Sequence, residues 1–108
     1  MERTSLTALA DEQLAAAREA SSGRAAVTVY GGQEHRLRQT LIALTAGTRL
    51  GEHEAPPEAT LQVLVGAVTL HAGSTTWTGA NGDHVVIPQQ SHELEAISDA
   101  AVLLTVVT

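Results

Sequence analysis

The chain has 108 residues, of which 44% are apolar, and its formal net charge is −6. This length supports one hydrophobic core, and this apolar share is typical of a folded domain rather than a disordered chain. The basic residues are six arginines with no lysine. We therefore expect no nucleic-acid partner, because binding to nucleic acid requires a basic face.

The chain also lacks cysteine, which excludes disulfides, thiolate catalysis and cysteine-ligated zinc. No apolar run reaches the ~18 residues that a membrane-spanning helix needs. The N-terminal sequence does not have the charged and then apolar pattern of a signal segment. We therefore expect no membrane partner and a cytoplasmic location.

The first segment is predicted to be a helix over Ser5–Ser21. Apolar residues recur there at intervals of three and four, which places them on one face. These residues are Leu6, Leu9, Ala10, Leu14 and Ala17. Thr4 or Ser5 is suited to cap the start, and Gly23 is typical of the residue that follows a helix end. We expect residues 1–22 to pack as a helix on the remainder of the chain or on a partner subunit.

From residue 23 onward the hydrophobic pattern alternates, which is typical of β-strands. The predicted strands are Ala26–Tyr30, Arg36–Leu44, Thr60–Val65, Val68–His71, Thr75–Thr78, Asp83–Ile87, Glu93–Ile97 and Val102–Val107. Turn residues separate these strands roughly every 8–12 residues, and no helical pattern lies between them. The sequence therefore predicts an all-β fold, a sandwich or barrel, over residues 23–108.

The last predicted strand, Val102–Val107, is apolar at both alternating sets of positions apart from Thr105. A strand with one face in water would carry polar residues on that face. We therefore expect both faces to be covered, the second one by the helix or by a partner subunit. An apolar face of this kind also predicts a homodimer.

Two stretches resemble the paired motifs of the cupin superfamily. The first motif has a glycine, five residues, a histidine, one residue, a second histidine, three or four residues, a glutamate, six residues and a closing glycine. The second has a glycine, five residues, a proline and then a glycine and a histidine, and this chain has one residue fewer before that histidine. The matching positions are Gly47, His53 and Gly66 in the first stretch and Gly82, Pro88 and His92 in the second. The resemblance covers roughly residues 37–107, and the surrounding sequence looks like that of a group of small bacterial cupins without an assigned activity. It implies a jelly-roll β-barrel preceded by a short N-terminal α-helix.

In metal-binding cupins the two motifs supply three histidines and one glutamate to a divalent ion, commonly iron, manganese, nickel or zinc. The matching positions here are His53, Ala55, Ala59 and His92. The resemblance therefore leaves His53 and His92 as the metal ligands, and two imidazoles leave most of the coordination shell to water. We expect such a site to hold metal weakly. We also expect metal loss below about pH 6, because imidazole coordinates when neutral and titrates near 6.5.

Two more residues are candidates for a ligand pocket with these histidines. His35 and Gln39 share one face of the predicted strand 36–44 and its approach, and Arg36 and Arg38 share the other. If the first face is inside, His35 and Gln39 join the pocket. If the second is inside, Arg36 and Arg38 offer a fork for a carboxylate or phosphate. The sequence leaves both alternatives open.

Two functional hypotheses follow from the resemblance. The first is a barrel that binds a small molecule, with or without a weakly held divalent metal, as a sensor or carrier. The second is a metal-dependent enzyme such as a dioxygenase, an isomerase or a decarboxylase. We favour the first, because Ala55 and Ala59 occupy two positions that hold ligands in metal-binding cupins. The sequence does not identify the small molecule or any catalytic residue.

Overall fold

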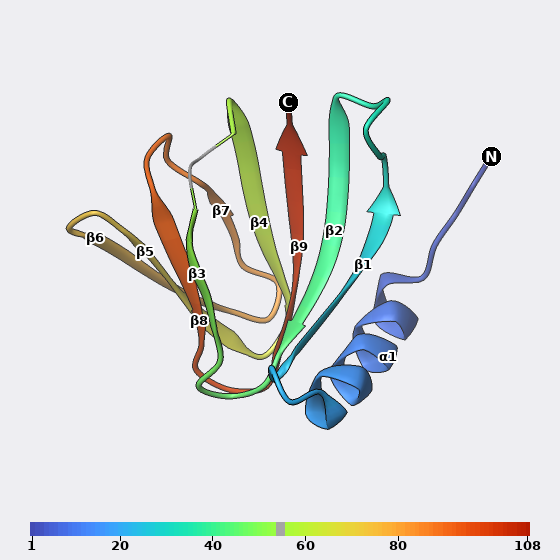
Figure 1. The fold of residues 1–108 in the computed structure, drawn as a ribbon, viewed down its shortest axis with the longest axis horizontal. Coiled ribbons are helices and arrows are strands. Elements are labelled where there is room, and N and C mark those ends of the chain that lie inside the picture. The colour runs from blue at the N-terminus through green and yellow to red at the C-terminus, as the bar shows by residue number, and fades with distance from the viewer. Residues whose placement is uncertain (54–55) are drawn as a thin grey trace.

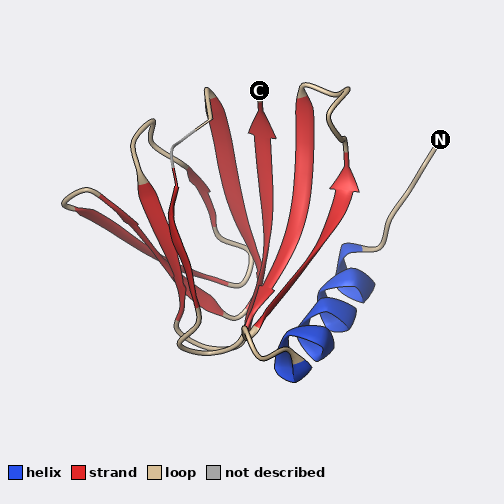
Figure 2. Ribbon diagram, in the orientation of Figure 1, coloured by secondary structure: helices blue, strands red, loops and turns tan. Residues whose placement is uncertain are grey.

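The computed structural model describes residues 1–53 and 56–108, and the side chains of these residues except Glu52 and His53. Figures 1 and 2 show one helix lying outside two groups of strands. The elements in chain order are α1 Leu6–Glu19, β1 Arg24–Tyr30, β2 Leu37–Leu44, β3 Arg49–His53, β4 Glu58–Val65, β5 Ala67–Ala72, β6 Thr75–Ala80, β7 His84–Val86, β8 His92–Ala96 and β9 Ala100–Val107. The predicted all-β fold with a short N-terminal helix is confirmed.

The strands form two antiparallel sheets. One has five strands in the order β1-β2-β9-β4-β7, and the other has four in the order β3-β8-β5-β6. The two sheets come together at the lower end of Figure 1 and diverge at its upper end, where β9 finishes and β2 starts. This arrangement is a jelly-roll-like barrel that is open at one end.

The main core lies between the two sheets. It is built from the inward-facing residues of both, and Leu44, Val63, Val68 and Val102 are among its fully buried members. Aliphatic and β-branched side chains fill it, as expected for a chain without phenylalanine. Trp77 of β6, the chain's single tryptophan, packs against this core from the four-stranded sheet, and its indole ring lies beside Gly79.

A second core lies between α1 and the outer face of the five-stranded sheet. Ser5 caps the helix, accepting a hydrogen bond from the Ala8 amide at 3.2 Å. Three helix residues are buried against three sheet residues in this layer, namely Ala10, Leu14 and Ala17 against Leu41, Ala43 and Ala101. In β9, Ala101 faces the helix while Val102 faces the inner core. The helix is thus one cover of this doubly apolar strand, which was one of the two alternatives predicted.

The strand β3 was not among the predicted strands. It begins at Arg49 and pairs with β8, with Leu50 opposite Leu94. Its short alternating pattern, Arg49-Leu50-Gly51-Glu52, includes a glycine and only one apolar residue, so the hydrophobic pattern did not indicate a strand there. This strand carries the backbone of His53 to a position opposite His92.

Candidate ligand pocket between the sheets

His92 lies at the start of β8 and on the inner face of its sheet. Every second residue of this strand faces the core, and Leu94 and Ala96 are buried there. His92 itself is half-buried, and its Nδ1 lies 3.1 Å from the carbonyl oxygen of Gln90. A short connection after β7 therefore fixes the ring near the open end of the barrel.

The backbone of His53 lies directly across from His92. The two residues are partners in the antiparallel register of β3 and β8, after an irregularity between Leu50 and His53. Opposite residues of an antiparallel pair have Cα atoms about 4.5–5.5 Å apart. The fold thus brings together the two positions that were predicted to share one site, while the side chain of His53 and the whole of Ala55 lie outside the described residues.

A hollow of about 250 Å³ opens beside His92 and continues inward as a smaller one of about 50 Å³. The outer part is lined by Ile42, Leu50, Pro56, Ala59, Ile87, His92, Leu104 and Val106. The inner part adds Leu61, Leu70 and Leu94. His92 is the polar side chain of this described lining, and every other side chain is apolar. The pocket is therefore a small apolar cavity with one imidazole on its wall.

The described residues of this pocket provide too few donor atoms for a resident metal centre. Ala59 occupies a position where metal-binding cupins place a ligand, and it is buried in the core with a methyl group. Within the described part of the chain, no three histidine, aspartate or glutamate side chains cluster so as to hold an ion. Among the described residues, the register places only the backbone of His53 opposite His92, and zinc sites use at least three protein ligands.

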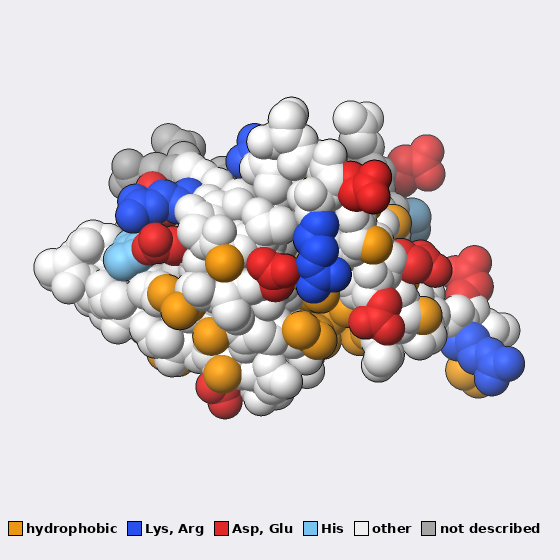
Figure 3. Space-filling view, turned by 90° about the horizontal axis from the view of Figure 1, so that it is seen from below, with side chains coloured by type: hydrophobic (Ala, Val, Ile, Leu, Met, Phe, Trp, Pro, Cys, Tyr) orange, Lys and Arg blue, Asp and Glu red, His pale blue; other side chains and the backbone are white. Residues whose placement is uncertain are grey.

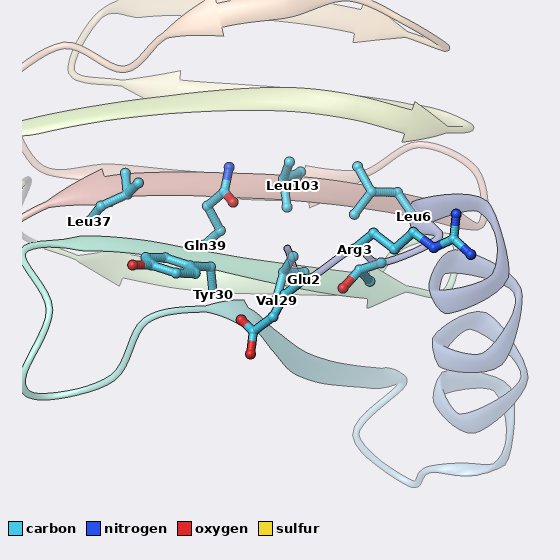
Figure 4. A pocket seen from close by; sticks show the side chains of 9 residues that line it. Glu2, Arg3, Leu6, Val29, Tyr30, Leu37, Gln39 and Leu103 are labelled. Atoms are coloured by element: carbon cyan, nitrogen blue, oxygen red, sulfur yellow. The ribbon is translucent and has the colours of Figure 1, made fainter.

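Gln39 lies on the other face of the five-stranded sheet, so the expectation that it joins His92 is corrected. In β2, Leu41 and Ala43 face the helix layer whereas Ile42 and Leu44 face the core. Gln39 shares the outer face and donates from Nε2 to Thr105 Oγ1 at 3.2 Å. Figure 4 shows it on the floor of an outer groove of about 410 Å³, with Leu103, Leu37 and Tyr30 around it.

His35 also lies away from the pocket, which corrects the second candidate. It is exposed in the connection between β1 and β2, and its ring meets the Tyr30 ring edge-on at a centroid distance of 5.2 Å. The alternative fork is not formed either, because the Arg38 guanidinium donates to the carbonyl oxygens of His35 and Gln33. The side chains of His35 and Arg38 therefore stabilise the connection between β1 and β2 and do not lie in the barrel.

The apolar lining was not identified from the sequence. Ile42, Leu50, Ile87 and Leu104 line both parts of the hollow together with His92. Each comes from a different strand or strand end, and aliphatic residues at such positions look the same whether they fill a core or line a cavity. Only the alternation within β2 and β9, which places Ile42 and Leu104 on the inner faces of their strands, could have indicated this lining.

A charged cluster lies on the outer face of the four-stranded sheet. Arg49 donates to Glu93 at 3.1 Å and to Glu95 at 3.4 Å, and His71 Nε2 lies 3.5 Å from Glu95. These residues face away from His92 because they have the opposite parity in their strands.

In Figure 3, the basic side chains on the face seen from below are few and scattered among acidic ones. Exposed ion pairs of this kind contribute little stability each.

The described part of the chain contains no helix that is both long and apolar enough to cross a membrane.

No protein-family model matches the chain. No curated protein matches it either. Among solved structures, a conserved protein of unknown function from Streptococcus pyogenes is similar at 27% identity and a TM-score of 0.73, over 82% of this chain and 77% of that one. A cupin superfamily protein from Desulfitobacterium hafniense is similar at 13% identity and a TM-score of 0.71, over 78% and 76%.

A larger enzyme contains a similar domain. The chain resembles salicylate 1,2-dioxygenase from Pseudoaminobacter salicylatoxidans at 24% identity and a TM-score of 0.76. The alignment covers 98% of this chain but 34% of the dioxygenase, so the chain spans about a third of that enzyme's length. At this identity the comparison establishes the common fold and not the activity.

Proposed function

The chain has the cupin fold, and from this premise we propose that it binds a small, largely apolar molecule in the cavity beside His92. The observation that carries this proposal is the cavity itself, whose described walls are aliphatic apart from one imidazole. Transfer of apolar groups from water into such a cavity is favourable by about 0.8 kcal/mol for each CH₂ group. The protein would then act as a carrier or sensor of that molecule.

The size of the cavity limits the ligand. Its outer part, about 250 Å³, is smaller than the ~300–1,000 Å³ typical of sites for drug-sized molecules. A single aromatic ring or a short aliphatic chain matches this volume. The ligand should also be uncharged, because the described lining residues include no lysine or arginine to pair with a carboxylate. Burial of an unpaired charge would cost more than the apolar contacts contribute.

His92 gives the ligand an orientation. Its imidazole is the one described polar group on the wall, so a hydroxyl or carbonyl on the ligand would hydrogen-bond there while the apolar part points toward Leu61 and Leu70. A phenol has both features. Salicylate, the substrate named for the dioxygenase of similar fold, adds a carboxylate that this cavity does not match.

A metal-dependent dioxygenase, isomerase or decarboxylase is the alternative proposal, and the donor set supports it less well. One described histidine and its register partner are too few ligands for a resident ion. Weak binding of a divalent metal by this pair is compatible with the ligand-binding proposal.

The experiment measures the thermal stability of the protein with phenol, toluene and salicylate, because a ligand of the folded state raises Tm. Phenol and toluene should raise Tm and salicylate should not. Ala59→Leu fills the cavity and should abolish the shift. Ala15→Leu makes the same change at an exposed position of α1 and should leave the shift intact. His92→Leu should lower the preference for phenol over toluene. Equal shifts in the Ala59→Leu protein, or no shift with any probe, would overturn the proposal.

A further inference from the structure

Another hollow opens beside the barrel cavity, where β1 and β2 of one sheet meet β3 of the other. This groove has a volume of about 350 Å³. Its lining includes Ser22, Arg24, Ala26, Thr40, Ile42 and Leu50. Ile42 and Leu50 also line the cavity beside His92, so their side chains stand between the two hollows. The groove is therefore a separate space that shares an apolar wall with the cavity.

The alternation of β1 gives this groove its floor. Ala25 packs toward α1, which places its neighbours Arg24 and Ala26 on the opposite face of the sheet. The register agrees, because Ala26 is the partner of Ile42, which faces the core between the sheets. The side chain of Ala26 is a single methyl group, so the strand leaves room above it. The apolar surface of Ile42 and Leu50 is half-buried there.

Arg24 brings a positive charge to this groove. It belongs to none of the ion pairs in the described part of the chain. The described lining of the groove also contains no acidic residue. The outer groove beside Tyr30 contains an arginine as well, Arg3, but Glu2 lines that groove too and offsets the charge. Of these two arginine-lined hollows, the one beside β3 therefore carries the uncompensated positive charge and is the one that suits an anion.

The positive charge and the apolar wall are separated along β1. Arg24 and Ala26 have Cα atoms about 7 Å apart, because a strand advances about 3.4 Å per residue and they are alternate residues. A ligand that contacts both needs an anionic group at one end and a chain of several carbon atoms behind it. In salicylate the carboxylate is bonded directly to the ring, so salicylate does not provide this separation.

We propose that this groove binds a short linear aliphatic carboxylate. The carboxylate pairs with the Arg24 guanidinium, whose planar fork can donate two parallel hydrogen bonds to such a group. The chain lies over Ala26 and against Ile42 and Leu50, where each CH₂ group removed from water favours binding. This site is distinct from the cavity beside His92, so the inference goes beyond the function proposed above.

An NMR titration at low ionic strength tests the groove, with the backbone amide of Ala26 as the reporter. Hexanoate should shift this amide at lower concentration than acetate, which lacks the chain, or hexan-1-ol, which lacks the charge. Arg24→Gln should weaken hexanoate binding by about fivefold, the size of an exposed ion pair, and leave hexan-1-ol unchanged. Arg36→Gln removes an exposed arginine outside the groove and should change neither. Equal weakening of hexanoate by both variants, or equal affinity for the three probes, would overturn the proposal.

The salt dependence gives a second measurement on the unmodified protein. Added salt screens the pairing of a carboxylate with an exposed arginine, whereas apolar contacts are not screened in this way. The affinity for hexanoate should therefore fall as ionic strength rises, while the affinity for hexan-1-ol at the Ala26 amide should not fall. Hexanoate binding that is insensitive to salt would contradict the role of Arg24.

Two variants that fill one hollow each separate the groove from the cavity. Ala26→Leu should abolish hexanoate binding while toluene still raises Tm, and Ala59→Leu should have the reverse effect. Loss of hexanoate binding in the Ala59→Leu protein but not in the Ala26→Leu protein would mean that the acid enters the barrel, and would overturn the proposal. Hexanoate binding at the groove with no toluene shift would support the proposal and contradict only the function proposed for the cavity.

Discussion

Arg18, in the last turn of α1, donates from Nε to Oδ2 of Asp99 at 2.9 Å. The other carboxylate oxygen of Asp99 accepts from the Ala46 amide, also at 2.9 Å. One exposed side chain therefore joins the helix, the turn after β2 and the turn before β9. The Ala46 amide first, and the Arg18 guanidinium second, hold the pKa of Asp99 below its ordinary value.

Asp99→Asn should lower Tm near neutral pH by a few degrees, because the charged form is the one that these contacts stabilise. A carboxylate with a lowered pKa in the folded state contributes stability above its unfolded pKa, near 3.9, and loses it as pH falls through the folded pKa. The difference in Tm between parent and variant should therefore shrink below about pH 4. Asp11→Asn, at an exposed position of the same helix, is the control and should change Tm less. A difference that persists unchanged at low pH would contradict this explanation.

Leu14→Ala should lower the free energy of unfolding by about 2–5 kcal/mol, the range for loss of a buried leucine. Leu14 is 5% exposed and packs between α1 and the outer face of the five-stranded sheet. Leu9→Ala provides a graded comparison, since Leu9 is only partly buried in the same layer. Urea denaturation measures both values. Similar small losses for the two variants would mean that the helix contributes little to stability.

Gly66→Ala should destabilise the protein more than Gly82→Ala does. Both glycines have a positive φ, +85° and +86°, so alanine pays a similar backbone cost of about 1–3 kcal/mol at each. An added Cβ at Gly66 would also lie 2.9 Å from the Cα of Ala100 and closer still to the Asp99 carbonyl, whereas at Gly82 it meets nothing within 4 Å. The difference between the two Tm changes measures the close approach of the turn after β4 to the start of β9. Equal changes would contradict it.

Divalent metal should bind weakly and depend on the histidine pair. We expect untagged protein to retain zinc or nickel well below one ion per chain after dialysis, because two imidazoles complete only part of a shell. His53→Ala with His92→Ala should abolish the residual binding seen by calorimetry, and His84→Ala, at an exposed position of β7, should leave it unchanged. Near-stoichiometric metal in the parent would favour the enzyme alternative. A double variant that binds as well as the parent would end the prediction of a shared site.

The alternation of apolar residues was sufficient to predict the fold class and every described strand except β3, because most strands have one face in a core. It was not sufficient to choose the inner face of β2. Ile42 and Leu44 face the core while Leu41 and Ala43 face α1. Both faces of β2 are therefore apolar, and the pattern does not show which face lies inside the barrel. The face of Gln39 was left open for this reason, and only the position of the helix resolves it.

The end of β4 shows a second limit of pattern reasoning. Ala59, Leu61 and Val63 face the core, but Val65 is 36% exposed because the register with β9 shifts after Val63. An extra residue in one strand reverses the face of everything beyond it, and no residue type in this stretch signals it. The motif resemblance predicted that the imidazoles of His53 and His92 approach each other. The register places the two residues opposite each other, and the side chain of His53 lies outside the described residues.

Trp77 and α1 provide independent optical reporters on opposite sides of the molecule. The indole is the single tryptophan fluorophore and packs on the core from the four-stranded sheet, whereas the helical circular dichroism arises from α1 on the five-stranded sheet. Coincident transitions of the two signals would mean that both layers unfold as one cooperative unit. A dichroism change that precedes the fluorescence change would show that the helix detaches first, and would give its docking free energy directly, separate from that of the barrel.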